Sequence, residues 1–414
     1  MTVLAGRSIF AYGIFGLPLA FVALPIYVHV PHLYSSAFGM SLALVGTVLL
    51  IARLGDAFID PLIGHVSDRW PQRKLSIALA LPALALGLWG LLRPLSDAPG
   101  AIWLVSMLAL VYLGFSLASV NHNAWGAELS QDPHERTRIT ATREGFGLVG
   151  VVLASVLPGL LSDVALTGMA RLAVVFVALL LGCAALTLGF APLRSVGAVQ
   201  APQLQSSLLE PVRSARFRAL LWVFAISGIA AAIPASLVLF FIADVLQAEA
   251  KSGAFLAIYF VCAAAGLPGW VWLSRRIGKL RAWLAAMLLA VLVFVWAGTL
   301  GTGDVVAYGL ICALSGLALG ADLALPPSML ADTVERDSLG AGACFGWWNF
   351  VTKLNLALAA GLALPLLQSL KYTPGQRDAD GLVALAVVYA AVPAALKLVS
   401  AALLWRGRHL IAEN

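Results

Sequence analysis

Long apolar runs alternate with short polar segments along the whole chain. Each run holds about 20 residues or more, the length that an α-helix needs to cross the roughly 30 Å hydrocarbon core of a bilayer. The segments between the runs carry most of the charged side chains. This pattern predicts an all-α polytopic membrane protein of about twelve transmembrane helices, near residues 9–30, 41–66, 75–95, 101–128, 139–161, 172–191, 219–243, 252–273, 281–300, 305–331, 339–368 and 381–405.

Composition supports a lipid environment. Apolar residues make up 61% of the chain and charged residues only 11%, whereas a soluble domain carries roughly 25% charged residues. The first apolar run is not followed by a cleavage signature, so we interpret it as a membrane helix rather than a signal peptide. The four cysteines lie inside apolar runs without metal-ligand spacing and are predicted to be small core residues, at positions Cys183, Cys262, Cys312 and Cys344.

The basic residues indicate the topology. An even number of spans places both termini on one side, and if that side is cytoplasmic the inner segments hold 17 Lys and Arg residues against 5 in the outer segments. Cytoplasmic loops carry such an excess in membrane proteins. The net charge of +6 is therefore explained without nucleic acid, and we predict a bacterial cytoplasmic (inner) membrane protein with both termini cytoplasmic.

The longest polar segment, 192–218, lies at the middle of the chain. It predicts an N-terminal six-helix bundle over 1–191, a cytoplasmic linker over 192–218 and a C-terminal six-helix bundle over 219–414. A weak repeat supports two halves, because Pro61 and Ser67 recur 207 positions later as Pro268 and Ser274. Parallel halves of this kind are typical of secondary transporters, with the substrate site near mid-depth between the repeats.

We single out seven charged residues inside the apolar runs, where each costs roughly 2.5–3.5 kcal/mol on insertion scales. Arg53, Asp56 and Asp60 follow i, i+3, i+7 spacing and so share one helix face. Lys353 lies at the same predicted depth, and Asn121 falls, like Asp60, roughly 6–10 Å further toward the cytoplasm. These groups predict a site, to which the remaining charged residues also contribute: Arg143, Glu144 and Asp322.

Two carboxylates one helical turn apart resist simultaneous ionisation in a medium of low dielectric constant. Asp56 and Asp60 therefore share a proton, bind a cation, or pair with Lys353 and the arginines. The formal sum of three positive and four negative charges leaves one negative charge, which one H⁺ or Na⁺ would neutralise. The competing interpretation is that these groups are structural ion pairs that fix helix packing.

A polar triplet, Asn121-His122-Asn123, interrupts the otherwise apolar fourth run. His122 is either a ligand for the solute or a helix–helix hydrogen-bonding contact. Both alternatives remain open.

Two stretches resemble a known family. Gly64-x3-Asp68-Arg69, after the second span, resembles the loop signature of the major facilitator superfamily. The segment 45–64, with the pattern G-T-x4-A-R-x2-D-A-x2-D-P-x2-G, is similar to the second helix of the glycoside–pentoside–hexuronide:cation symporters, typified by melibiose permease. Shorter similar stretches include Tyr12-Gly13, Trp125, Arg143 and Lys353.

This resemblance implies two six-helix bundles and specific roles for single residues. Asp56 and Asp60 would bind the coupling cation, which includes a possible Na⁺, and Lys353 would interact with them. We group Asn121 with these coupling residues. The resemblance places Trp125 and Arg143 at the substrate cavity, and we assign Tyr12 to the substrate as well. His122 and Asp322 are absent from the family pattern and are assigned to the substrate as residues that would serve a different solute. The conformational loop motif is Gly64, Asp68 and Arg69.

The chain also departs from the family pattern. Ala20 and Asn121 stand where acids are typical, Ala118 replaces a threonine, and Ile59 replaces an asparagine. Because hard cations need several oxygen ligands, the loss of these side chains favours H⁺ over Na⁺ as the coupling ion. The missing acids also leave the solute open.

The sequence thus predicts a cation-coupled symporter for a sugar, glycoside or uronide-like solute, acting as a monomer in the lipid bilayer without a cofactor. The alternative is a lysolipid or organic-anion carrier on the same scaffold. A membrane-embedded enzyme or sensor is disfavoured, because the sequence contains neither HExxH nor GxSxG and has no large loop.

Overall fold

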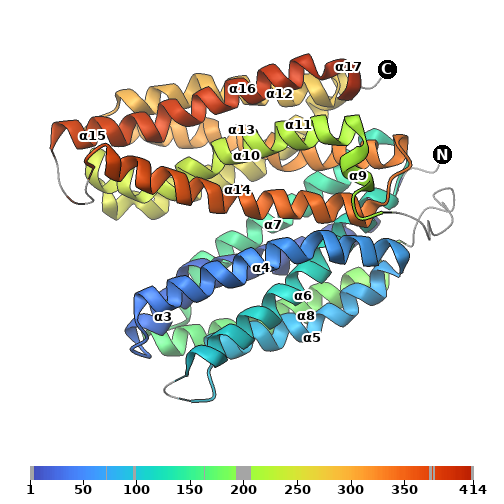
Figure 1. Ribbon diagram of the computed structural model, residues 1–414, viewed down its shortest axis with the longest axis horizontal. Coiled ribbons are helices and arrows are strands. Elements are labelled where there is room, and N and C mark those ends of the chain that lie inside the picture. The colour runs from blue at the N-terminus through green and yellow to red at the C-terminus, as the bar shows by residue number, and fades with distance from the viewer. Residues whose placement is uncertain are drawn as a thin grey trace. The chain divides into compact units, whose positions relative to one another are not determined.

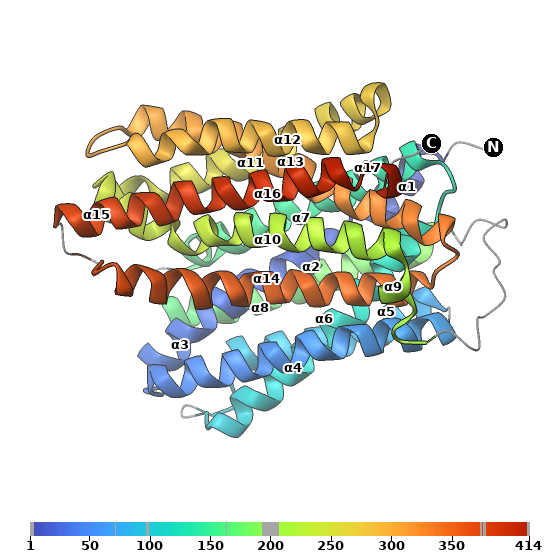
Figure 2. The same ribbon diagram turned by 45° about the horizontal axis from the view of Figure 1, so that its top comes forward.

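The computed structural model describes residues 4–70, 72–96, 99–162, 164–192, 207–372, 375 and 378–411. Over these residues the chain is almost entirely helical (Figures 1 and 2). Eleven helices of the described part are long and apolar enough to cross a membrane. A further helix, α4 (Leu42–Arg69), has 28 residues and contains Arg53, Asp56 and Asp60. The predicted all-α membrane fold of about twelve spans is confirmed.

The chain divides into two compact units. Unit 1 comprises Met1–Pro211 and Val334–Phe350, and unit 2 comprises Val212–Thr333 and Val351–Asn414. The helices of the first half of the chain are α1 (Gly6–Gly13), α2 (Gly16–Leu24), a π-helical segment (Pro25–His29), α3 (Val30–Ser36), α4, α5 (Arg73–Leu92), α6 (Ala101–Glu128), α7 (Pro133–Leu161) and α8 (Ala165–Phe190).

The second half follows the same scheme of long helices. Its elements are the short α9 (Glu210–Arg213), α10 (Ala215–Phe240) with a π-helical end (Phe241–Val245), a 3-10 turn (Glu249–Lys251), α11 (Ser252–Ile277), α12 (Lys279–Phe294) with a 3-10 end (Val295–Thr299), α13 (Val305–Arg336), α14 (Ala341–Ser369), α15 (Ala379–Ala386), a π-helical segment (Val387–Ala391), α16 (Val392–Arg406) and α17 (Arg408–Ile411).

Capping residues explain where several helices begin. The Ser41 hydroxyl accepts from the Leu44 amide at 3.3 Å and starts α4. Asp132 caps α7 and is followed by Pro133, which is favoured in the first turn because its missing N–H is not needed there. This helix starts six residues before the predicted 139, because a capped polar turn is invisible to hydropathy.

Each unit has its own apolar core. In unit 1, α5 packs against α6 and α8, α4 packs against α6, and α2 packs against α7; the neighbouring courses of α4, α6 and α5 can be followed in Figures 1 and 2. In unit 2, α16 packs against α10 and α12. The buried aromatic residues of these cores include Phe15, Phe21 and Phe176 in unit 1 and Phe241 and Tyr389 in unit 2.

Large apolar side chains also cover much of the surface. Ile102, Leu160 and Val306 are each more than 75% exposed. Such surfaces suit lipid, because lipid tails offer no hydrogen-bonding partners and the helices satisfy their backbone polar groups internally.

The predicted linker 192–218 is only partly described. Residues 193–206 lie outside the described residues, and the remainder contains α9 and the first turn of α10. The predicted boundaries of the two halves stay a prediction.

Candidate functional site

The two acids of α4 are buried in unit 1. Asp56 is 5% exposed and Asp60 is fully buried. The Ser116 hydroxyl of α6 donates a hydrogen bond to Asp56 Oδ1 at 2.6 Å. The α4–α6 contact therefore places a hydroxyl group against one of the two carboxylates predicted to bind the coupling cation.

Further polar groups continue this layer from α6 to the first part of α14. Asn349 Nδ2 donates to the Ser119 hydroxyl at 3.1 Å, and Ser119 lies one turn after Ser116 on α6. None of these three residues was predicted from the sequence. The available signal was the i, i+3 spacing of two serines in an apolar helix, which is weak because serine is common at packed faces of membrane helices.

Asp60 lies where α4 and α14 approach closely. A Cβ atom at Gly346 would come within 2.5 Å of the Asp60 carbonyl oxygen, and one at Gly342 within 2.4 Å of the Gly64 carbonyl oxygen. The two glycines of α14 are four residues apart, on one helix face. Glycine at these positions lets the backbones meet, as small residues do between membrane helices.

Lys353 is 8% exposed and belongs to the part of α14 that lies in unit 2. Its predicted interaction with Asp56 and Asp60 stays a prediction.

Asn121 lies in a different environment from the two acids. Its side-chain oxygen accepts from the Ser67 hydroxyl at 2.6 Å, and its amide donates to the Leu117 carbonyl at 2.8 Å. Ser67 precedes Asp68 of the loop motif. The structure thus joins Asn121 to the loop motif, and its coupling role stays a prediction.

Four of the predicted substrate residues come together in unit 1. The Tyr12 ring stacks on His122 with centroids 4.3 Å apart and meets Trp125 edge-on at 5.7 Å. The Arg143 guanidinium interacts with the Tyr12 hydroxyl and pairs with Glu144 at 2.5 Å. Residues from α1, α6 and α7 thus form one aromatic and cationic cluster.

Hydrogen bonds fix the orientation of His122 in this cluster. Its Nε2 lies 3.0 Å from the Tyr12 carbonyl oxygen, and because a carbonyl only accepts, Nε2 must carry the hydrogen. The Tyr12 hydroxyl in turn donates to the His122 carbonyl at 2.8 Å. This reciprocal pair fits the helix–helix contact that was left open for His122, while the stacked ring keeps it beside the other predicted substrate residues.

Close backbone approaches create the space for the cluster. A Cβ atom at Gly126 would lie 2.1 Å from the Tyr12 hydroxyl oxygen, and one at Gly16 would lie 2.4 Å from the Arg143 carbonyl oxygen. Lys74 also contacts this cluster, with Nζ 5.3 Å from the Trp125 ring centre.

Asp322, the remaining predicted substrate residue, lies in unit 2. Lys397 Nζ pairs with its Oδ2 at 2.5 Å, and the Trp283 indole donates to its Oδ1 at 2.7 Å. Lys397 also donates to the Ser227 hydroxyl at 2.8 Å. Lys397 lies inside the predicted span 381–405 but was not among the charged residues singled out from the sequence. Its pairing with Asp322 was not predicted, because 75 residues separate the two charges. Asp322 and the Tyr12 cluster thus belong to different units, and the substrate role of Asp322 stays a prediction.

The predicted loop motif forms a buried polar network. Asp68 accepts from the backbone amides of Gly342 and Ala343, both at 2.7 Å, at the start of α14, where a carboxylate is favoured. Arg73 pairs with Asp68 at 2.9 Å and with Glu128 of α6 at 2.8 Å. Arg69 is exposed beside this network. The motif therefore joins α4, α5, α6 and α14 within unit 1.

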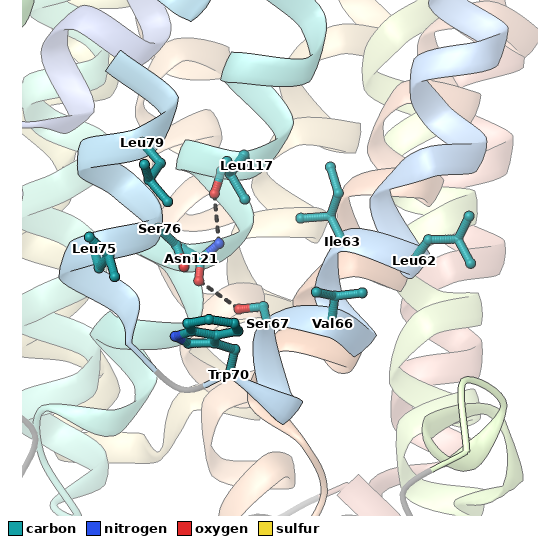
Figure 3. Close-up of a pocket in the computed structure, with 10 residues that line it drawn as sticks. All are labelled: Leu62, Ile63, Val66, Ser67, Trp70, Leu75, Ser76, Leu79, Leu117 and Asn121. Carbon is teal, nitrogen blue, oxygen red and sulfur yellow. Dashed lines mark hydrogen bonds between the residues drawn. The ribbon is translucent and has the colours of Figure 1, made fainter. Parts of the chain in front are cut away.

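One pocket of about 350 Å³ opens between α4, α5 and α6 (Figure 3). Its walls are mainly apolar, with leucine the most frequent residue, and of the predicted site residues only Asn121 lines it. Among the described residues, no group of three or more His, Cys, Asp or Glu side chains lies together as a metal site.

Comparison with known proteins supports the predicted class. Residues 9–408 match the family described as MFS/sugar transport protein. The isoprimeverose transporter of Lactiplantibacillus pentosus is 27% identical over 128 residues, covering 30% of this chain and 27% of that protein. The inner membrane symporter YicJ of Escherichia coli K12 is 28% identical over 130 residues, covering 30% and 28%. The aligned segments thus span little more than a quarter of these relatives.

Solved structures support the fold over nearly the whole chain. The E. coli fucose:proton symporter matches with a TM-score of 0.69 at 15% identity, covering 97% of both chains. The human organic anion transporter MFSD10 matches with a TM-score of 0.65 at 18% identity, covering 98% of this chain and 99% of that one. The resemblance seen in the sequence is confirmed, and the chain belongs to the MFS/sugar transport protein family of membrane transporters.

Proposed function

We propose that this transporter is a cation-coupled symporter and that the coupling ion is H⁺. The observation that carries the proposal is the burial of Asp56 and Asp60, one turn apart on α4, with the Ser116 hydroxyl against Asp56. Two such carboxylates repel each other, and a bound cation relieves the repulsion. A proton needs a single carboxylate oxygen, whereas Na⁺ needs several oxygen ligands.

The proposed solute is a sugar, glycoside or uronide-like molecule. The Tyr12, His122, Trp125 and Arg143 cluster supplies aromatic faces together with a few polar groups, the usual composition of a small-molecule site. The family description and the isoprimeverose transporter point to the same class of solute.

We place the protein in a bacterial inner membrane with both termini cytoplasmic. The 17-to-5 distribution of basic residues supports this orientation, and the related E. coli symporter is named an inner membrane protein. On this topology the Asp68 network lies at the cytoplasmic end of α4.

A lysolipid or organic anion is the second candidate solute. The buried guanidinium of Arg143 favours it, because a cation in an apolar setting attracts an anionic group. The Arg143–Glu144 pair weakens that attraction, so we rank it second.

The solute class is tested by thermal shift in detergent. Sugars, glycosides, uronates and lysolipids are screened at two pH values, with and without Na⁺. The proposal is supported if sugars raise the melting temperature, if this increase is larger at the lower pH, and if Na⁺ does not change it. Stabilisation by lysolipids alone favours the second candidate.

The coupling role is tested in proteoliposomes with the most stabilising solute. Inward solute flow is expected to acidify the lumen of wild-type vesicles, and Asp60→Asn is expected to abolish this acidification, because an amide cannot carry the proton. Asp380→Asn, in the exposed first turn of α15, is the matched control and should leave acidification unchanged. Coupled transport that survives both Asp56→Asn and Asp60→Asn would refute the assignment.

A further inference from the structure

The pocket between α4, α5 and α6 has walls suited to hydrocarbon. Leu62 and Val66 of α4 and Leu79 of α5 line it, and they are 52%, 61% and 65% exposed. The helices α5 and α6 are long and apolar enough to span a membrane. Apolar side chains this exposed on such helices face lipid tails rather than water.

The floor of the pocket offers packing rather than free hydrogen-bonding groups. The Ser67 hydroxyl and the Asn121 amide point toward each other in Figure 3 and are bonded at 2.6 Å. The Asn121 amide nitrogen donates a hydrogen bond to the Leu117 carbonyl oxygen. A polyhydroxylated solute would find few partners here, whereas an acyl chain needs none.

The rim of the pocket differs from its walls. Trp70, at the end of α4, is 60% exposed and lines the pocket, and tryptophan is enriched where a membrane helix meets the headgroups. The exposed Arg69 follows Leu62 and Val66 at i+7 and i+3, so it continues the same helix face. A guanidinium at this level binds phosphate through a planar fork of N–H donors.

We propose that this pocket is a binding site for a bilayer phospholipid with an anionic headgroup. One acyl chain lies against Leu62, Val66 and Leu79, and the phosphate meets Arg69 beside Trp70. The positive charge of Arg69, on the face of α4 that carries Leu62 and Val66, selects an anionic lipid over a zwitterionic one.

The occupant would touch the segment of α4 that holds the loop motif. Ser67, at the floor, accepts a hydrogen bond from Arg73, and Arg73 bonds Asp68 at 2.9 Å. Asp68 in turn caps the first turn of α14. A lipid in the pocket therefore packs against the polar network that joins α4 to α14.

Native mass spectrometry of the full-length protein in detergent tests the site, with dioleoyl phosphatidylglycerol and dioleoyl phosphatidylcholine as probes. The wild type is expected to retain phosphatidylglycerol at least fivefold more than phosphatidylcholine. Arg69→Gln should remove most of this preference, and Leu79→Trp, which fills the pocket, should lower retention of both lipids severalfold.

Two variants serve as matched controls. Leu86→Trp changes a leucine of similar exposure (61%) two turns further along the same face of α5. Arg276→Gln changes the arginine 207 positions after Arg69, at the end of α11. Both should bind lipid as the wild type does.

Three results would overturn the proposal. The first is equal retention of the two lipids by the wild type. The second is lipid retention that Arg69→Gln and Leu79→Trp leave unchanged. The third is a dimer without bound lipid that Leu79→Trp dissociates, which would mean that a second copy of the chain covers the pocket. None of these readouts depends on transport, so failure of the lipid site leaves the proposed symport untouched.

Discussion

The two units close their helix hairpins with the same kind of contact. In unit 1, Arg73 at the first position of α5 pairs with Glu128 at the last position of α6. In unit 2, Lys279 at the first position of α12 pairs with Asp332 near the end of α13. These two pairs join corresponding helices and show that a buried ion pair at this point is part of the fold of each unit.

The units differ at a position that precedes the basic residue of this pair in the chain. Unit 1 has Asp68, which binds Arg73 and also the amides of Gly342 and Ala343. The position 207 residues later is Arg275, which is exposed and has no acceptor atom in its side chain. The hairpin pair therefore serves stability in both units, whereas the link to the start of α14 is special to unit 1 and is the part suited to a conformational role.

The largest expected effect comes from removing the shared cation in unit 1. Arg73→Met removes the cation that Asp68 and Glu128 share, and the side chains of these two acids are only 10% and 8% exposed. We expect a loss of about 4–5 kcal/mol of unfolding free energy, the upper part of the usual range for breaking a buried pair. A thiol-reactive dye reports the melting temperature, because Cys183, Cys312 and Cys344 are buried and react on unfolding.

The exposed neighbour provides the control for this experiment. Arg69→Met should shift the melting temperature little, since exposed charges contribute roughly 0–1 kcal/mol. Equal shifts for Arg73→Met and Arg69→Met would show that the buried network does not stabilise unit 1.

A smaller effect is expected in unit 2. Lys279→Met removes the cation that pairs with the buried Asp332, so we expect a loss of about 3 kcal/mol. The double variant Lys279→Met/Asp332→Asn should regain most of this loss, because both charges of the pair are then removed together. The double variant Arg73→Met/Glu128→Gln should regain less of its unfolding free energy, since Asp68 keeps its charge. Equal recovery of unfolding free energy in the two units would contradict the special role of Asp68 in unit 1. The same dye measures all four proteins.

Hydropathy predicted the positions of the helices because lipid imposes one requirement on every span, a long apolar run. It failed at the start of α7, where Pro133 and the five polar or charged residues that follow it are helical. Their helical state depends on the Asp132 cap and on packing, which a hydropathy window does not measure.

Parts of the candidate site were equally visible in the sequence. Asp56 and Asp60 stood out because a charge in an apolar run is costly and therefore rare. Ser116 and Asn349 did not, because single small polar residues are ordinary in membrane helices. The Lys397 partner of Asp322 could not be found either, since the pairing of distant charges depends on which helix faces meet.

The smallest effect is expected at Asp68, the residue that differs between the two units. Asp68→Asn keeps the size of the side chain but removes the charge that accepts from two amides at the start of α14. We expect a loss of about 1 kcal/mol, as for other helix caps, and faster hydrogen–deuterium exchange confined to the amides of residues 341–346. Arg275→Gln, at the equivalent position of unit 2, should change neither stability nor exchange. Unchanged protection of the α14 start in Asp68→Asn would remove the link to α14, and the loop motif would then be one more hairpin contact like that of Lys279.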